Sequence, residues 1–122
     1  MQNHHQPPPQ VKALVFFETW CPYSQQYMND VELMNQQYRD MGVEVIGLTM
    51  ATHSSTDAQV RQFITDYDLT FSVLKETGRC HNFFDVRGTP MTVLLHEGEV
   101  IWESKGINYL TSQMLEGIVA AN

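Results

Sequence analysis

The sequence predicts an α/β fold, a sandwich in which helices cover a mixed β-sheet. Residues 11–17 form a short, nearly all-apolar run, which is typical of a strand buried on both faces of a sheet. Strand-like and helical patterns then alternate along the chain. Towards the end, two strand-like segments flank a tight turn and predict an antiparallel hairpin.

The first helix is predicted to start near residue 24 and to lie on the sheet. Its apolar residues recur at steps of three and four: Met28, Val31, Met34, Tyr38 and Met41. Core packing explains the methionines of this set. Gly42 is placed to end the helix, and residues 43–49 predict the next strand.

The middle of the chain predicts a second helix, a short strand and a brief third helix. Thr56 and Gln59 have the spacing of a capping box. Residues 71–74 are a short strand candidate, and residues 78–84 a brief helix. The helical faces are predicted to be Val60, Phe63, Ile64 and Tyr67 on the second helix, and Cys80, Phe83 and Phe84 on the third.

The last part of the chain predicts a hairpin followed by a helix. Residues 91–95 and 99–103 flank a turn that contains Gly98. Gly106 breaks the pattern after the hairpin. The final helix is indicated by helical spacing of Leu110, Met114, Leu115 and Ile118.

Length and composition predict one domain, residues 11–122, preceded by a polar, proline-rich arm at residues 1–10. The formal net charge of −7, without a Lys/Arg cluster, argues against nucleic acid or an anionic membrane as partner. No apolar stretch has the length of a membrane span and no signal peptide opens the chain. The possibility that a leader or membrane anchor precedes this sequence stays open.

Cys21 is the predicted reactive residue, because it lies where an apolar strand joins a helix. Unpaired N–H groups and the helix dipole at a helix N-terminus favour a thiolate. Cys80 is predicted to pack on an apolar face. The two cysteines lie far apart with no C-x-x-C spacing, so neither a zinc site nor a disulfide framework is indicated.

The histidines are predicted to be solvated rather than functional. His4 and His5 lack the spacing of a metal site, and no metal is expected. His53 and His96 fall in predicted loops. His81 is expected on the surface of the short third helix, although it could tune the neighbouring cysteine.

Several motifs in order resemble the thioredoxin fold, in particular the TlpA, ResA and DsbE group of thiol:disulfide oxidoreductases. The resemblance covers roughly residue 11 to the C-terminus. It implies a three-layer α/β/α sandwich with a central β-α insertion, and a periplasmic or membrane-tethered setting. The motifs are Trp20-Cys21-Pro22-Tyr23-Ser24 after a strand, residues 42–46, 63–67, 71–74 and 84–86, then Gly88-Thr89-Pro90 and Gly106.

The resemblance assigns roles to particular residues. Cys21 matches the nucleophilic cysteine, and Trp20, Pro22 and Tyr23 match the positions around it. Pro90 matches a cis-proline beside that cysteine, and a cis bond is accessible to X–Pro at a modest cost. The backbone of the preceding Thr89 would pair with an extended substrate peptide by strand addition. Trp20 and Tyr23 are expected to rim the site.

Three positions depart from the family pattern. Ser24 replaces the resolving cysteine, and a hydroxyl cannot carry out thiol–disulfide exchange. Val15 and Tyr27 stand where the resemblance implies acidic residues of a proton relay. Glu18 is the nearest carboxylate in sequence, but strand alternation does not establish that it faces Cys21.

The resemblance implies a thiol:disulfide oxidoreductase that acts on protein thiols or disulfides through a mixed disulfide on Cys21. Ser24 has two explanations, a cysteine changed to serine to trap that intermediate or a natural monothiol protein. We favour the trap, because the surrounding site is otherwise intact. The implied role lies in cytochrome c maturation or periplasmic thiol reduction. The expected protein is a monomer without a cofactor, and its partners are a protein substrate and a redox partner protein.

Two other functions stay open at this point. A thioredoxin-fold module could hold a partner in the groove at Thr89 and Pro90 without turnover. A glutathione-dependent monothiol protein could release its adduct with an outside thiol or share an iron–sulfur cluster. The central segment at residues 43–74 and the lack of an obvious basic cluster for glutathione disfavour the glutaredoxin-like form that shares an iron–sulfur cluster.

Overall fold

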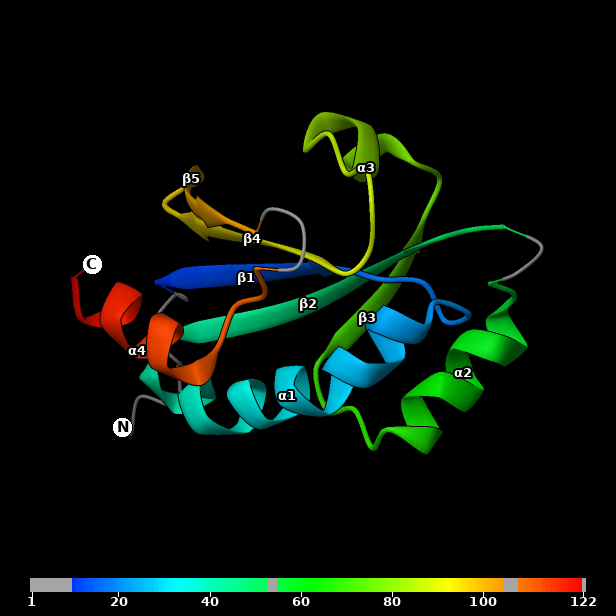
Figure 1. Ribbon diagram of the computed structural model, residues 1–122, viewed down its shortest axis with the longest axis horizontal. Coiled ribbons are helices and arrows are strands. Elements are labelled where there is room, and N and C mark those ends of the chain that lie inside the picture. The colour runs from blue at the N-terminus through cyan, green and yellow to red at the C-terminus, as the bar shows by residue number, and fades with distance from the viewer. Residues whose placement is uncertain (1–9, 53–54, 105–107, 122) are drawn as a thin grey trace, which may run out of the picture.

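The computed structural model describes residues 10–52, 55–104 and 108–121. A five-stranded sheet with the order β3-β2-β1-β4-β5 forms its centre (Figure 1). Strands β1 (Val11–Phe16), β2 (Val43–Met50) and β3 (Ser72–Glu76) run parallel to one another. Strands β4 (Met91–His96) and β5 (Glu99–Glu103) are antiparallel additions on the other side of β1. The mixed sheet is therefore confirmed.

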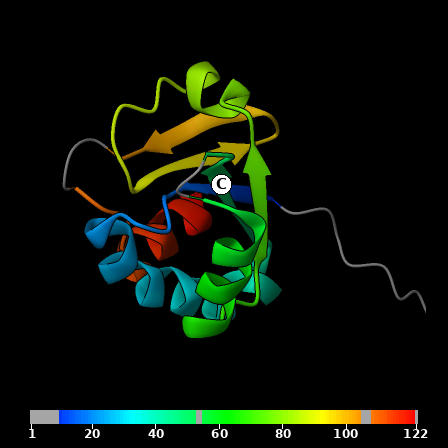
Figure 2. The same cartoon turned by 90° about the vertical axis from the view of Figure 1, so that its right-hand side faces the viewer.

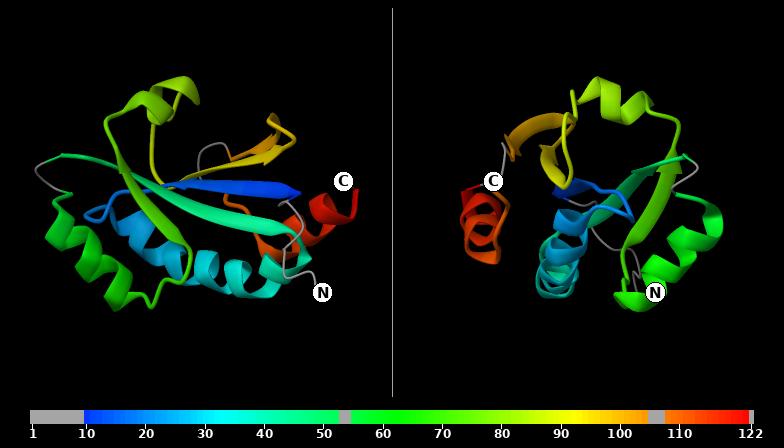
Figure 3. Two further views of the ribbon diagram at one scale, coloured as in Figure 1. Left: turned by 180° about the vertical axis from the view of Figure 1, so that it is seen from behind. Right: turned by 45° about the vertical axis from the view of Figure 1, so that its right-hand side comes forward.

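Helices cover both faces of this sheet, which gives the predicted sandwich. Helices α1 (Pro22–Tyr38), α2 (Asp57–Asp66) and α4 (Ser112–Ala121) lie on one face (Figures 1 and 2). Helix α3 (Arg79–Phe83) lies on the opposite face, as two further views also show (Figure 3). Helix α2 and strand β3 form the β-α insertion that adds an edge strand next to β2.

Two apolar cores result from the alternation of side chains along β1. Val15 and Phe17 belong to the larger core under α1, α2 and α4, whereas Leu14 and Phe16 belong to the smaller core under α3. Phe17 stacks on Phe63 of α2, with ring centroids 5.2 Å apart. Because β1 is buried on both faces, the carboxyl end of this strand is a rigid platform for the turn after it.

Local signals in the sequence set the predicted element boundaries. The capping box of α2 is present, since the Thr56 hydroxyl accepts from the Gln59 backbone N–H and the Gln59 side chain accepts from the Thr56 N–H. Gly42 ends a 3₁₀ turn, η1 (Arg39–Met41), with φ of +91°, a conformation that favours glycine. Helix α1 starts at Pro22, two residues earlier than expected.

The prediction that Met41 packs in the core is wrong, because its side chain is exposed. The residue lies in η1, and a 3₁₀ turn advances the chain by three residues per turn rather than 3.6. The helical spacing that places Met34 and Tyr38 in the core therefore no longer applies at Met41.

The apolar face predicted for the third helix is also wrong in part, because Phe83 is 79% exposed. His81, predicted to be on the surface, is buried instead. His81 and Phe84 are three residues apart and share the inward face, where both rings contact Phe16. Cys80 packs against the edge of the same small core, as predicted.

His96 is not a solvated loop residue, because it ends β4 and its Nδ1 atom lies 2.6 Å from the Gln10 carbonyl oxygen. His53, Gly106 and most of the arm at residues 1–10 lie outside the described residues. Within the described part of the chain, no helix is long and apolar enough to cross a membrane.

Candidate active site

Cys21 is the N-cap residue of α1, directly after the turn that ends β1. Its backbone is extended, with φ of −83° and ψ of 119°, and Pro22 opens the first helical turn. Proline is favoured there because its missing N–H would have no partner in the helix and its fixed φ suits the helical conformation. The Cys21 carbonyl accepts from the Gln25 N–H at 3.0 Å. The sulfur therefore lies at the positive end of the α1 dipole.

The second half of the site is the loop before β4. The peptide bond between Thr89 and Pro90 is cis, as the resemblance implies. The Cys21 Sγ atom lies 3.6 Å from the Thr89 carbonyl oxygen, a contact in which a thiol donates. Cys21 is a free cysteine and is largely buried by these contacts. The structure thus brings Cys21, Thr89 and Pro90 together.

The surroundings of Cys21 lower the pKa of its thiol below the ordinary value of 9.0. Burial alone would raise this pKa, since it removes the charged form from water. Hydrogen bonds from the Thr89 side chain, from the backbone and hydroxyl of Ser24 and from the Tyr23 backbone outweigh burial by stabilising the thiolate. The site therefore favours the nucleophilic form of the sulfur.

Ser24 lies within the site and is fully buried, with 0% of its surface exposed. Its Oγ atom accepts from the Glu18 backbone N–H at 3.3 Å. One side of the hydroxyl thus faces the chain before the turn, and the same side chain contributes to the lowered pKa of the Cys21 thiol. A hydroxyl in this place can stabilise the Cys21 thiolate but cannot attack a disulfide on it.

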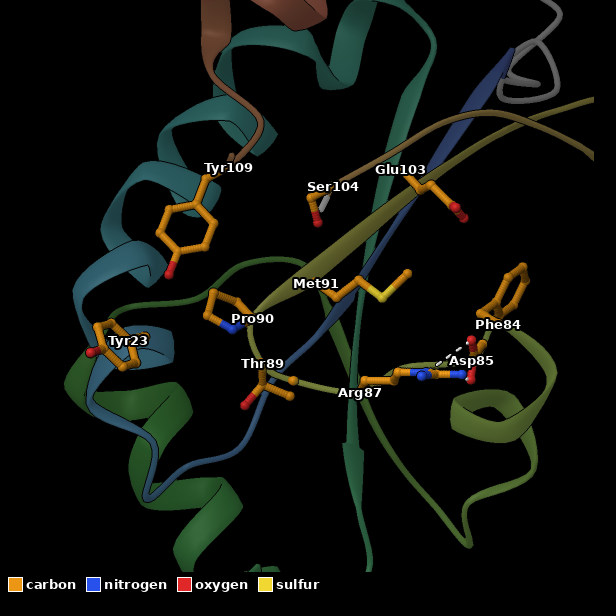
Figure 4. Close-up of a pocket in the computed structure, with 11 residues that line it drawn as sticks. Tyr23, Phe84, Asp85, Arg87, Thr89, Pro90, Met91, Glu103, Ser104 and Tyr109 are labelled. Atoms are coloured by element: carbon orange, nitrogen blue, oxygen red, sulfur yellow. Dashed lines mark hydrogen bonds and ion pairs between the residues drawn. The ribbon is translucent and has the colours of Figure 1, made fainter. Parts of the chain in front are cut away.

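A pocket of about 490 Å³ opens beside the cis-proline (Figure 4). Tyr23, Pro90 and Tyr109 gather at one side of it, and Phe84, Asp85 and Arg87 lie at the other. Tyr23 and Trp20 are exposed. Trp20 lies on the turn before Cys21 but does not line the pocket. The lining consists of Tyr23, Phe84, Asp85, Arg87, Gly88, Thr89, Pro90, Met91, Glu103, Ser104 and Tyr109.

The two positions where the resemblance implies acidic residues hold neutral, buried side chains. Val15 lies in the core under α1. The Tyr27 hydroxyl donates to the Leu110 carbonyl, and burial raises the pKa of this phenol. Tyr27 therefore stays protonated and holds the segment before α4 against α1.

Sequence reasoning missed a buried cluster of ionisable side chains next to the Cys21 turn, formed by Glu18, His81 and Glu76. The Glu18 carboxylate accepts from the hydroxyls of Thr49 and Ser55, at 3.0 and 3.2 Å. A signal was present, since Glu18 is the one charged residue between the apolar strand and Cys21. The link to His81 has no counterpart in the sequence, because it depends on the packing of α3 over β1.

Among the residues that the structure describes, no group of three or more His, Cys, Asp or Glu side chains is arranged to hold a metal ion. The chemistry available at the site is that of the Cys21 sulfur. A thiolate at a helix N-terminus, beside a cis-proline and an open pocket, is suited to nucleophilic attack on a sulfur atom brought to that pocket.

Residues 6–106 match the AhpC/TSA family, which is most of the chain. This chain belongs to the AhpC/TSA family. Among curated members, it is 32% identical over 88 residues to the thioredoxin-like protein YneN of Bacillus subtilis, a match that covers 72% of this chain and 51% of that protein. It is 29% identical over 105 residues to the thiol-disulfide oxidoreductase ResA of Halalkalibacterium halodurans, covering 84% of this chain and 57% of that protein. The chain thus spans little more than half the length of these relatives.

Solved structures show the same fold. StoA from Bacillus subtilis superposes with a TM-score of 0.77 at 20% identity, covering 91% of this chain and 83% of that one. A secreted disulfide oxidoreductase of Mycobacterium tuberculosis homologous to E. coli DsbE superposes with a TM-score of 0.75 at 19% identity, covering 94% and 84%. The AhpC/TSA chain therefore has the thioredoxin-like fold that the motifs imply.

Proposed function

We propose that this AhpC/TSA protein is a thiol:disulfide oxidoreductase that forms a mixed disulfide with protein substrates through Cys21. The observation that carries the proposal is the position of the Cys21 sulfur, at the start of α1 and 3.6 Å from the Thr89 carbonyl that precedes the cis-proline. Named relatives support it, since the ResA proteins that match the chain are called thiol-disulfide oxidoreductases.

The first chemical step is an exchange in which no external oxidant or reductant takes part. The Cys21 thiolate attacks one sulfur of a substrate disulfide. A new S–S bond forms between Cys21 and that sulfur, while the other substrate sulfur leaves as a thiolate and takes a proton from water. A pKa of Cys21 below its ordinary value raises the fraction of attacking thiolate near neutral pH.

Ser24 determines the fate of the mixed disulfide. With serine at the resolving position, this intermediate persists until a thiol from outside the chain attacks it. The same result holds whether the serine is natural or replaces a cysteine. The chain as given therefore stops at the adduct unless a redox partner protein or a small thiol such as glutathione releases it.

The substrate proposed for this site is an extended protein segment that contains a cysteine. The backbone at Thr89 would pair with it by strand addition, which holds the substrate sulfur near Cys21. The adjoining pocket, lined by apolar groups such as Phe84, Met91 and Tyr109, suits an apolar side chain next to that cysteine. An extracytoplasmic role, such as cytochrome c maturation or thiol reduction, fits a secreted structural relative.

A second candidate function is partner binding without turnover. The buried Ser24 hydroxyl favours it, because the site lacks an internal thiol to complete a cycle. Exposed Trp20 and Tyr23 would then contribute contact area to a partner rather than guide a reacting disulfide.

The test compares three forms of the chain: unaltered, Ser24→Cys and Ser24→Ala as the matched control. Each form is first reduced, freed of the reductant and mixed with insulin, and the chain is then weighed by mass spectrometry. We expect Ser24→Cys to reduce an insulin disulfide and to be recovered oxidised without an adduct, whereas both other forms accumulate a stable adduct. If no form reacts, the oxidoreductase proposal fails and the binding module is favoured.

A further inference from the structure

Three ionisable side chains form a buried cluster beside the Cys21 turn. The side chains of His81, Glu18 and Glu76 are only 8%, 10% and 12% exposed. The Glu76 carboxylate contacts the His81 Nδ1 atom, and the Glu18 carboxylate lies 3.7 Å from the His81 Nε2 atom. Phe16 packs edge-on against the imidazole, with ring centroids 4.8 Å apart. His81 thus bridges two carboxylates that face it from the turn after β1 and from β3.

Glu18 connects this cluster to Cys21 through its own backbone. Its carbonyl accepts from the Cys21 N–H at 3.1 Å, and its N–H donates to the Ser24 Oγ atom at 3.3 Å. Its side chain is fixed on the other side by Thr49 and Ser55, whose hydroxyls donate to it. One residue therefore anchors the turn to β2 and at the same time brackets Cys21 and Ser24.

Glu76 and His81 connect the cluster to the chain that leads to the cis-proline. The Glu76 carboxylate accepts from the backbone N–H groups of Gly78, Cys80 and His81 at 2.7, 3.1 and 3.1 Å, which fixes the start of α3. The loop after α3 continues to Thr89 and Pro90. The cluster therefore ties together the two segments that meet at the site.

Burying carboxylates is costly unless they are paired, and an apolar residue at position 18 would avoid that cost. One atom of the cluster, His81 Nε2, is buried and has no hydrogen-bond partner among the described residues. This atom faces the Glu18 carboxylate. The free-energy cost of burying these polar groups is expected if the cluster fixes the geometry of the reacting site and does not serve stability alone.

We propose that Glu18, held by the hydroxyls of Thr49 and Ser55 and facing His81, is a positioning residue for Cys21: it sets the position of the Cys21 sulfur relative to Ser24 and Thr89. The proposal rests on Cys21 as the reacting residue of the proposed function. It does not make Glu18 a proton donor or acceptor in the exchange.

The test is the pH profile of Cys21 alkylation by iodoacetamide, followed by mass spectrometry of the tryptic peptides 13–39 and 80–87, which separate Cys21 from Cys80. The decisive variants are Glu18→Gln and Glu18→Asp. If Glu18 acted only as a nearby negative charge, Glu18→Gln would lower the midpoint, since a like charge disfavours the thiolate, and Glu18→Asp would leave it unchanged. Loss of positioning instead raises the midpoint in both variants, by about half a pH unit.

Glu32→Gln is the matched control. Glu32 is also a buried carboxylate, but it accepts from the N–H and hydroxyl of Thr70 and from the side chain of Gln36, which lie outside the Cys21 turn. Loss of the Glu32 carboxylate should lower the stability of the protein, but it should leave the alkylation midpoint of Cys21 unchanged. The proposal is overturned if the Glu18 variants match this control, or if Glu18→Gln lowers the midpoint.

Ser55→Ala provides a milder perturbation in case the Glu18 variants do not fold. It removes one hydroxyl donor from Glu18 and leaves the charges in place. We expect a smaller rise of the midpoint in the same direction, and an unchanged midpoint overturns the proposal. Because iodoacetamide needs no protein substrate, this result is independent of whether the chain exchanges disulfides.

Discussion

The Sγ atom of Cys21 lies 3.6 Å from the carbonyl oxygen of Thr89, although the two residues are 68 positions apart. The sheet explains the contact. Strands β1 and β4 are antiparallel neighbours, with Phe16 opposite Met91, so the end of one and the start of the other lie together. Cys21 comes after the first strand by a short turn, and Thr89 and Pro90 directly precede the second. The pairing of the two strands thus builds the site.

The Thr89 hydroxyl is expected to lower the Cys21 pKa, since it stabilises the thiolate. We predict that the alkylation midpoint of Cys21 lies below 9.0 in the unaltered chain and rises in Thr89→Val. Thr70→Val, which changes the same groups near Glu32, is the control and should leave the midpoint in place. A midpoint that is equal in Thr89→Val and in the unaltered chain would contradict this role.

Glu76 is expected to contribute stability that acid removes. Burial raises the pKa of this carboxyl, but hydrogen bonds from His81 and from the α3 backbone lower it to about 2, below the ordinary value of 4.5. Between these values the unfolded chain binds more protons, so stability should fall as the pH drops from about 4.5 towards 2. Urea unfolding across this range should give a flatter dependence for Glu76→Gln. An identical slope in both forms would refute the assignment.

Tyr27 is expected to act in structure and not in proton transfer. Tyr27→Phe removes the donor to the Leu110 carbonyl and should lower the free energy of unfolding by about 1 kcal/mol. Because burial raises the pKa of the phenol, it stays protonated throughout the assay range, and the Cys21 alkylation midpoint should not move. Tyr38→Phe, which loses a similar bond to the Ser112 carbonyl, is the matched control. A midpoint shifted only in Tyr27→Phe would show a proton role.

Much of the fold could be predicted from the sequence, because its signals are local and periodic. The capping box at Thr56 and Gln59 and the apolar run of β1 each specify one element without reference to the rest of the chain. The cis bond at Pro90 was predicted from family motifs, because proline alone has ready access to that conformation.

The errors arise where a short element or a long-range contact overrides periodicity. Met41 lies outside the core because the 3₁₀ turn changes the angle between successive side chains around the helix axis. On the five-residue helix α3, one turn offers a single inward position, and His81 takes it instead of Phe83. That choice depends on Glu18 and Glu76, which lie on separate elements, so no local pattern reveals it.

The central claim is that Cys21 forms the mixed disulfide with a protein substrate. Its most direct measurement is mass spectrometry of tryptic peptides after reaction of the chain with a disulfide-bonded protein, for the unaltered chain, Cys21→Ser and Cys80→Ser. The account predicts an adduct on the Cys21 peptide in the unaltered chain and in Cys80→Ser, and none in Cys21→Ser. An adduct on Cys80, or no adduct in any form, would contradict it.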